Sequence, residues 1–124
     1  MCERVVAVVD DDTRVLESLE DLLALAGHTV HVFSSAQSLL EDAVFGSIDC
    51  LISDIGMPKI DGFELERLAH AVRPDLPVIL ITGRIELIKG QRATKRRDGK
   101  TVLLKPFGER ELLDAINKAV LPRT

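Results

Sequence analysis

The sequence predicts an α/β fold in which a doubly wound parallel sheet of five strands carries helices on both faces. Short apolar runs alternate along the chain with segments of helical periodicity. Continuous apolar runs are typical of strands that are buried on both faces, as the strands of parallel sheets are. Alternating strands and helices form a parallel sheet between two helical layers. The 124 residues are enough for one such domain and too few for two.

The five predicted strands are short and mostly apolar. They cover Val5–Val9, His28–Phe33, Cys50–Ile52, Val78–Ile81 and Thr101–Leu104. The second strand is rich in β-branched residues, and we expect it near an edge of the sheet.

Four segments have the apolar periodicity of helices that face a core. They are residues 15–26, 36–43, 62–72 and 108–120. Asp12 or Thr13 can cap the first helix and Gly27 ends it, while Ser34 or Ser35 can cap the second. The third helix is expected to turn Phe63, Leu65, Leu68, Ala69 and Val72 toward the core.

The composition limits the classes of function. The net charge of −4 argues against a general affinity for nucleic acid. No run approaches the roughly 20 apolar residues of a membrane span, and the first strand begins without the basic-then-apolar order of a signal peptide. Cys50, one of two cysteines, lies within a strand and is expected to be buried. A disulfide framework is therefore not expected, and a cytoplasmic location fits best.

Polar residues follow four of the five predicted strands. Asp10, Asp11 and Asp12 follow the first, Asp54 the third, Thr82 the fourth and Lys105 the fifth. The carboxyl ends of parallel strands meet at one edge of the sheet, so these side chains are expected to converge there. Neighbouring carboxylates repel one another, and Mg²⁺ with its preference for oxygen ligands relieves that repulsion. An ammonium and a hydroxyl group suit phosphoryl oxygens. The pattern predicts a site that holds a phosphoryl group on or near a carboxylate, with Mg²⁺ bridging.

Four motifs, in this order, give the chain a family resemblance. They are "VVDDD" at 8–12, "SDIGMPKIDGFEL" at 53–65, "ITG" at 81–83 and "LKPF" at 104–107. Over nearly its whole length the chain resembles the receiver domain of two-component response regulators. The resemblance implies one receiver domain over residues 1–124, with a flavodoxin-like sheet of strand order 2-1-3-4-5 and no output domain within the chain.

The resemblance also implies the role of each site residue. Asp54 is the expected phosphoacceptor, and Thr82 and Lys105 are expected to bind phosphoryl oxygens. The expected metal ligands are Asp10, Asp11, Asp54 and the backbone carbonyl of Gly56. Of the acidic pair, Asp11 is expected to bind the metal directly and Asp10 through water. Mg²⁺ is the expected ion, with Mn²⁺ as a substitute.

The implied partners are those of a signalling protein. A sensor histidine kinase or a phosphotransfer protein would supply the phosphoryl group. The output would be a domain beyond Thr124 or a separate effector, with homodimerisation on phosphorylation as one outcome. No direct binding of nucleic acid or membrane is expected of this domain. It would catalyse only its own phosphotransfer and autodephosphorylation, so we do not expect an enzyme with a separate substrate.

Val102, Gly56 and Arg84 are the positions at which the chain departs from the family pattern. The family usually carries an aromatic residue three positions before the lysine, where this chain has Val102, and the sequence contains no Tyr or Trp. The switch positions are therefore Thr82 and Val102, without a ring to rotate. Gly56 and Arg84 occupy the positions that tune phosphoryl lifetime in the family. The Lys105–Pro106 bond is expected to be cis, as in similar receivers, since cis costs little before proline.

Residues 84–98 hold a helix in the family, but here the pattern for one is weak. The apolar face begins with Ile85 and Ile88 and then gives way to basic residues, with Gly90 in the interior. We expect this segment to be short, displaced or partly disordered in the unphosphorylated state, and to become ordered on an acidic partner. The alternative is a solvated helix whose Lys and Arg stems lie along the core edge.

Two alternative functions stay open on the sequence. "VVDDDT" also resembles the start of haloacid dehalogenase phosphatases, with Asp10 as nucleophile and Asp12 as acid and base. The short chain and the unexplained Asp54 count against that alternative. A receiver-like module that is never phosphorylated is also disfavoured. All five side chains expected at the phosphorylation site are present, namely Asp10, Asp11, Asp54, Thr82 and Lys105.

Overall fold

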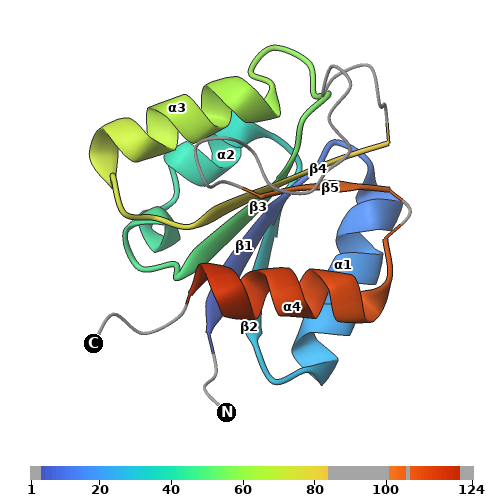
Figure 1. Ribbon diagram of the computed structural model, residues 1–124. Coiled ribbons are helices and arrows are strands. Elements are labelled where there is room, and N and C mark those ends of the chain that lie inside the picture. Colours follow the sequence, from blue (N-terminus) through green and yellow to red (C-terminus); the bar gives the residue numbers. More distant parts are fainter. Residues whose placement is uncertain (1–3, 84–100, 106, 121–124) are drawn as a thin grey trace.

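The computed structural model describes residues 4–83, 101–105 and 107–120. Five parallel strands form one sheet in the order β2-β1-β3-β4-β5 (Figure 1). The strands are β1 (Val5–Val9), β2 (Thr29–Phe33), β3 (Cys50–Asp54), β4 (Val78–Thr82) and β5 (Thr101–Leu104). This strand order is the one predicted, and β2 lies at an edge as expected.

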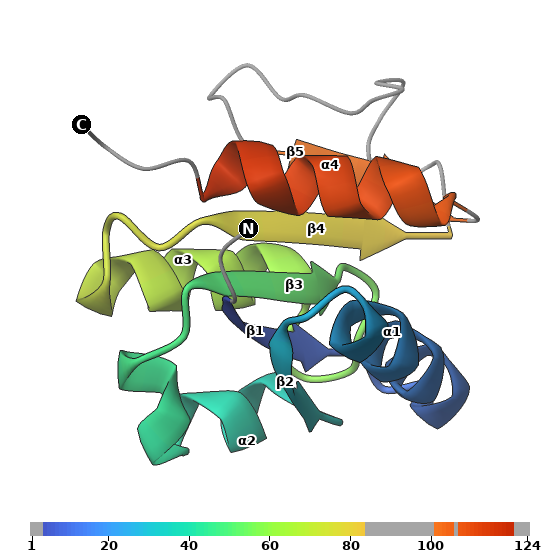
Figure 2. The same cartoon turned by 90° about the horizontal axis from the view of Figure 1, so that it is seen from below.

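Helices cover both faces of the sheet. They are α1 (Thr13–Leu25), α2 (Ala36–Leu40), α3 (Gly62–Val72) and α4 (Glu109–Ala119), with a 3₁₀ turn η1 (Ala43–Gly46) after α2. Figures 1 and 2 show α2 and α3 on one side of the sheet and α1 and α4 on the other. The predicted doubly wound architecture is therefore confirmed.

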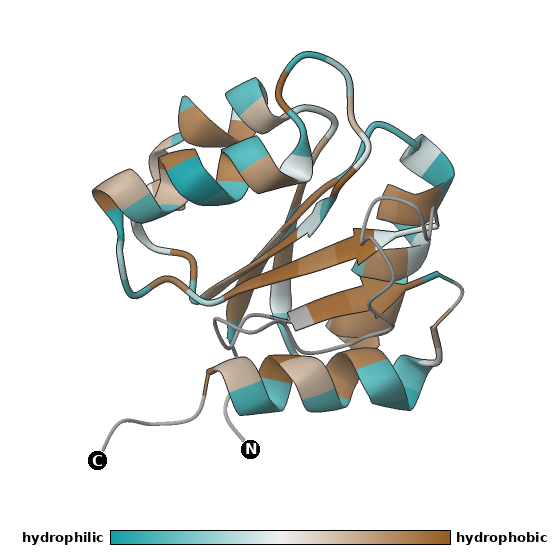
Figure 3. Ribbon diagram, turned by 45° about the horizontal axis from the view of Figure 1, so that its top comes forward, coloured by the Kyte–Doolittle hydropathy of each residue, from teal (hydrophilic) through white to brown (hydrophobic). Residues whose placement is uncertain are grey.

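The core consists of two apolar clusters, one on each side of the sheet. Ala7, Leu51 and Leu80 face α2 and α3, whereas Val8, Ile52 and Ile81 face α1 and α4. Successive side chains of a strand point to opposite faces, so strands with two apolar faces supply both clusters. Figure 3 shows the resulting pattern, with apolar strands between helices that are polar on their outer sides.

Two strands extend further than predicted. The strand predicted to end at Ile52 continues through Ser53 to Asp54, and β4 continues to Thr82. Their ladder is still intact there, because Ile55 N donates to Ile81 O at 2.8 Å beyond the last residue of β3. Backbone pairing does not require apolar side chains, so a polar residue was a poor marker of the strand end.

The structure corrects the predictions for the second helix, for His28 and for Val72. The second predicted helix stops at Leu40, because the side chain of Asp42 accepts from Val44 N and starts η1 as a separate turn. His28 belongs to the turn after α1 rather than to β2, since its N–H donates to Leu23 O. In α3, Val72 is 68% exposed rather than inward.

Three predictions concern residues outside the described ranges. They are the state of segment 84–98, the side chain of Arg84 and the cis Lys105–Pro106 bond. Within the described part, no helix is both long and apolar enough to cross a membrane.

Candidate functional site

Three carboxylates converge at the carboxyl edge of the sheet. Asp10 and Asp11 follow β1, and Asp54 is the last residue of the adjacent β3. One oxygen from each of the three lies within 4.8 Å of the others. Asp10 and Asp54 are buried, at 1% and 7% exposure, while Asp11 is exposed. The sequence prediction that these residues meet at one edge is confirmed.

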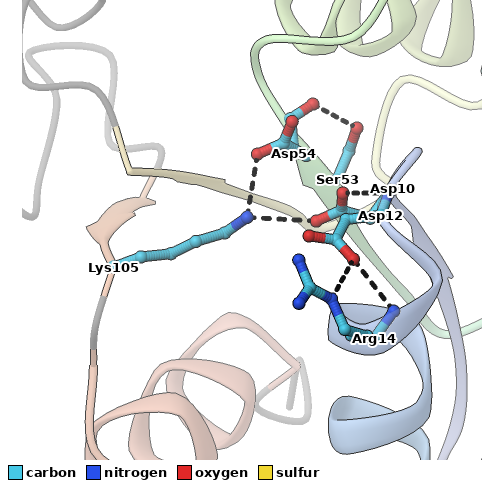
Figure 4. Close-up of polar contacts among 6 residues, drawn as sticks. All are labelled: Asp10, Asp12, Arg14, Ser53, Asp54 and Lys105. Carbon is cyan, nitrogen blue, oxygen red and sulfur yellow. Dashed lines mark hydrogen bonds and ion pairs between the residues drawn. The ribbon is translucent and has the colours of Figure 1, made fainter.

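Lys105 joins this cluster from the far side of β4. Its Nζ donates to Asp10 Oδ2 at 3.1 Å and to Asp54 Oδ1 at 3.2 Å (Figure 4). The backbone of Lys105 is held in place by a hydrogen bond, in which Lys105 N donates to Thr82 O at 2.7 Å. A single ammonium therefore bridges carboxylates from two strands.

Burial and charge act against each other at this site. Burial raises the pKa of Asp10, although its hydrogen bond from Asp12 N and the Lys105 ammonium oppose that rise. Burial would lower the pKa of Lys105, but the charges of Asp10 and Asp54 outweigh it and the pKa is raised. The lysine is thus held in its charged form beside two acids.

Asp12 has a structural task instead of a place in the cluster. Its Oδ1 accepts from Arg14 N at 2.9 Å as the N-cap of α1, and the Arg14 guanidinium lies 3.5 Å away. The hydrogen bond from Arg14 N lowers the pKa of Asp12. The Asp12 carboxylate is engaged in the cap of α1 and is not one of the clustered acids, so the phosphatase alternative loses its second residue.

The loop after β3 turns sharply at Gly56. Met57 N donates to Ile55 O at 3.0 Å, which closes a three-residue γ-turn with Gly56 at its centre. Gly62 N donates to the same carbonyl at 2.9 Å, and Asp61 caps α3 by accepting from Glu64 N. Gly56 is exposed, two residues after the buried Asp54.

The two predicted switch positions lie in the core rather than on the surface. Thr82 is the last residue of β4, is 1% exposed and pairs in register with Leu104. Val102 is 2% exposed within the cluster that faces α2 and α3. A small buried valine offers no ring that could swing between an inward and an outward position.

The sequence pattern did not single out Ser53. This residue is completely buried in an apolar strand, and its hydroxyl donates to the backbone carbonyl of Asp54 at 3.0 Å (Figure 4). The sequence does contain a signal for Ser53, because it is a polar residue in the apolar run before Asp54.

The donor set of the cluster suits a hard divalent cation. Carboxylate oxygens from Asp10, Asp11 and Asp54 can approach one ion, and each is the type of ligand that Mg²⁺ and Mn²⁺ take. A cation here would also relieve the repulsion between the three acids.

Comparison with known proteins identifies the family. The model of the response regulator receiver domain matches residues 6–117. The chain belongs to the response regulator receiver domain family. The response regulator protein TodT of Pseudomonas putida is 35% identical over 116 residues, which are 94% of this receiver domain and 51% of TodT. TmoT of Ectopseudomonas mendocina is 36% identical over 95% of the chain and 53% of its own length.

Solved structures agree with this assignment. A response regulator receiver domain protein from Clostridium thermocellum has a TM-score of 0.79 and 30% identity, with 94% of each chain covered. The response regulator StyR has a TM-score of 0.79 and 34% identity, covering 96% of this receiver domain and 60% of StyR. The receiver domain thus spans about half the length of the curated relatives named above.

Proposed function

We propose that Asp54 accepts a phosphoryl group from a histidine kinase or a phosphotransfer protein in a reaction that depends on Mg²⁺. The observation that carries the proposal is the Lys105 ammonium, which lies between the buried carboxylates of Asp10 and Asp54. A phosphoryl group would add negative charge to a site that already holds several carboxylates. An ammonium fixed beside those carboxylates can offset the added charge.

Each residue has a defined part in this reaction. Bound Mg²⁺, held by Asp10, Asp11, Asp54 and the Gly56 carbonyl, would neutralise negative charge on the phosphoryl oxygens. One oxygen of Asp54 attacks phosphorus, and the bond from phosphorus to the donor breaks in line with the attack. Lys105 then moves from the free carboxylate pair to a phosphoryl oxygen, and the Thr82 hydroxyl donates to another.

The consequence of phosphorylation is the regulation of a partner. We infer that the phosphorylated form controls an output domain of a longer protein or a separate effector, because the relatives TodT and TmoT are about twice as long as the matched region. The domain would catalyse only its own phosphorylation and dephosphorylation. Control of phosphoryl lifetime falls to Gly56 and Arg84 in this proposal.

The test uses acetyl phosphate as a small donor and intact mass as the readout. We expect the wild-type protein to gain one phosphoryl group with Mg²⁺ and none after chelation of the metal. Asp54→Asn should abolish the gain, whereas the neighbouring Asp12→Asn should retain it. Uptake by Asp54→Asn at the wild-type rate, or mapping of the label to Asp10, would refute the proposal and favour the phosphatase chemistry.

A further inference from the structure

The peptide that joins Asp54 to Ile55 is held at several points. Ser53 Oγ donates to the Asp54 carbonyl at 3.0 Å, and Ile55 N on the other side of this peptide donates to Ile81 O at 2.8 Å. The oxygen and the nitrogen of one peptide unit are therefore both fixed. The plane of this peptide sets the backbone ψ angle of Asp54, and hence how its side chain leaves the strand.

Gly62 packs against the same peptide. A Cβ at Gly62 would lie 2.5 Å from the Asp54 carbonyl oxygen and 2.7 Å from Ile55 Cα, distances that no side chain can accept. Gly62 N also donates to Ile55 O at 2.9 Å. The first turn of α3 thus lies in direct contact with the backbone of the phosphoacceptor.

Ser53 is a costly choice for this position unless its hydroxyl is used. It is 0% exposed and pairs in register with Val9 and Leu80, both members of the apolar cluster facing α2 and α3. A buried hydroxyl is tolerated when it is hydrogen-bonded. The Ser53 hydroxyl donates to the backbone carbonyl of Asp54, the residue whose carboxylate must be oriented toward the phosphoryl donor.

We propose that Ser53 is a positioning residue for the phosphoacceptor. Its hydroxyl fixes the Asp54–Ile55 peptide against Gly62, so that the Asp54 carboxylate stays directed at the incoming phosphorus. This inference rests on the proposed function of Asp54. A nucleophile that is held in line reacts faster, and small misplacements lower the rate strongly.

The first experiment compares two truncations in the same strand. Ser53→Ala and Cys50→Ala each remove one heavy atom from a fully buried position of β3. With acetyl phosphate and saturating Mg²⁺, we expect Ser53→Ala to lower the limiting rate of phosphorylation about tenfold. Cys50→Ala should lower stability while leaving this rate within about twofold of wild type. Equal rate losses in both variants would mean general loosening of the core and would overturn the inference.

The second experiment separates the hydroxyl from the volume of the side chain. Ser53→Thr and Ser53→Val have nearly the same shape, so any strain from the added methyl groups is common to both. We expect the threonine variant to react about tenfold faster than the valine variant. Equal rates in this pair would show that the hydroxyl does not position Asp54.

A third measurement does not depend on phosphorylation. In the free protein, Ser53→Ala should shift and broaden the ¹³C carboxyl signal of Asp54, and Cys50→Ala should leave it unchanged. An unchanged Asp54 signal in Ser53→Ala would contradict the positioning role. Absence of phosphorylation in the wild-type protein together with the expected signal change would refute the proposed function alone.

Discussion

Burial of an ionised side chain in the acidic site lowers the stability of the folded state, and Asp10 is the clearest case. The Asp10 side chain is almost completely buried, and burial raises its pKa above the ordinary value of 3.8. A raised pKa in the folded state means that folding favours the protonated form. This contribution to stability is fully present below the unfolded pKa and is lost as the pH rises through the folded pKa. Near neutral pH, the ionised Asp10 therefore destabilises the metal-free fold.

The substitution Asp10→Asn should stabilise the metal-free protein. Asparagine removes the buried charge, and its single amide oxygen can still accept from Asp12 N, while Lys105 retains its contact with Asp54. We expect a gain of about 0.5–2 kcal/mol near neutral pH, in the range of single stabilising substitutions. Urea unfolding at about pH 4 and about pH 7 measures it. A gain that is larger at the lower pH would contradict the assignment, because the two forms should converge as Asp10 takes up its proton.

A second residue carries backbone strain. Lys59 has a φ of 65° in the loop between β3 and α3, a left-handed conformation that disfavours side chains with a Cβ. Lys59→Gly should raise the free energy of unfolding by about 0.5–1 kcal/mol, because relief of strain exceeds the added chain entropy. The matched control is Gly27→Ala, which places a Cβ at a φ of 97° and should destabilise. Loss of stability in Lys59→Gly would show that the strain is already relieved by contacts of the lysine.

At the scale of elements, Arg73 ties α3 to the segment that leads into β3. Its Nη1 donates to the carbonyls of Phe45 and Ile48, both at 2.8 Å. Arg73→Met keeps most of the aliphatic stem and leaves both carbonyls without this donor. We expect a loss of about 1–3 kcal/mol, the cost of unsatisfied buried acceptors, measured by urea unfolding.

The control for this prediction comes from the same helix. Arg67 pairs with Glu64 on the exposed face of α3, and surface pairs contribute little to stability. Arg67→Met should change the free energy of unfolding by less than about 1 kcal/mol. If both variants lost the same amount of stability, the contact of Arg73 with η1 and the segment leading into β3 would have no special role.

At the scale of the whole molecule, Mg²⁺ should stabilise the fold through the acid cluster. The cluster assembles residues from β1 and β3, so it exists only in the folded chain. A ligand that binds only the folded state raises its stability with concentration, by about 2.7 kcal/mol at a hundredfold excess over Kd. Thermal unfolding across a Mg²⁺ series tests this expectation.

Salt at equal ionic strength is the necessary control, because screening alone also weakens the repulsion between acids. Asp54→Asn should reduce the Mg²⁺ effect, whereas Asp12→Asn should retain it because Asp12 caps α1 outside the cluster. An equal response of both variants would place the metal elsewhere.

The chain's strands and its site were readable from the sequence for a shared reason. An apolar run is a local signal of a strand, and parallel topology carries the polar residues at or just after each run to one edge of the sheet. The convergence of Asp10, Asp54 and Lys105 follows from these two facts, and the structure confirms it. The departure from the family pattern at Val102 could also be read from the sequence, because a small apolar residue stands there in place of the usual aromatic one.

Only the tertiary structure decided how the end of α3 is turned and how the backbone of Asp54 is held. Val72 was expected in the core and is exposed, while the carboxylate-bearing Glu66 is buried at 4% exposure. The absence of a Cβ at Gly62 lets the first turn of α3 pack directly against the Asp54–Ile55 peptide, a contact that periodicity alone cannot reveal. Sequence patterns encode which residues prefer burial, but close approach between distant segments depends on packing the whole chain at once. The sequence thus determined the fold and the set of polar groups at the sheet edge, and packing determined how those groups are oriented.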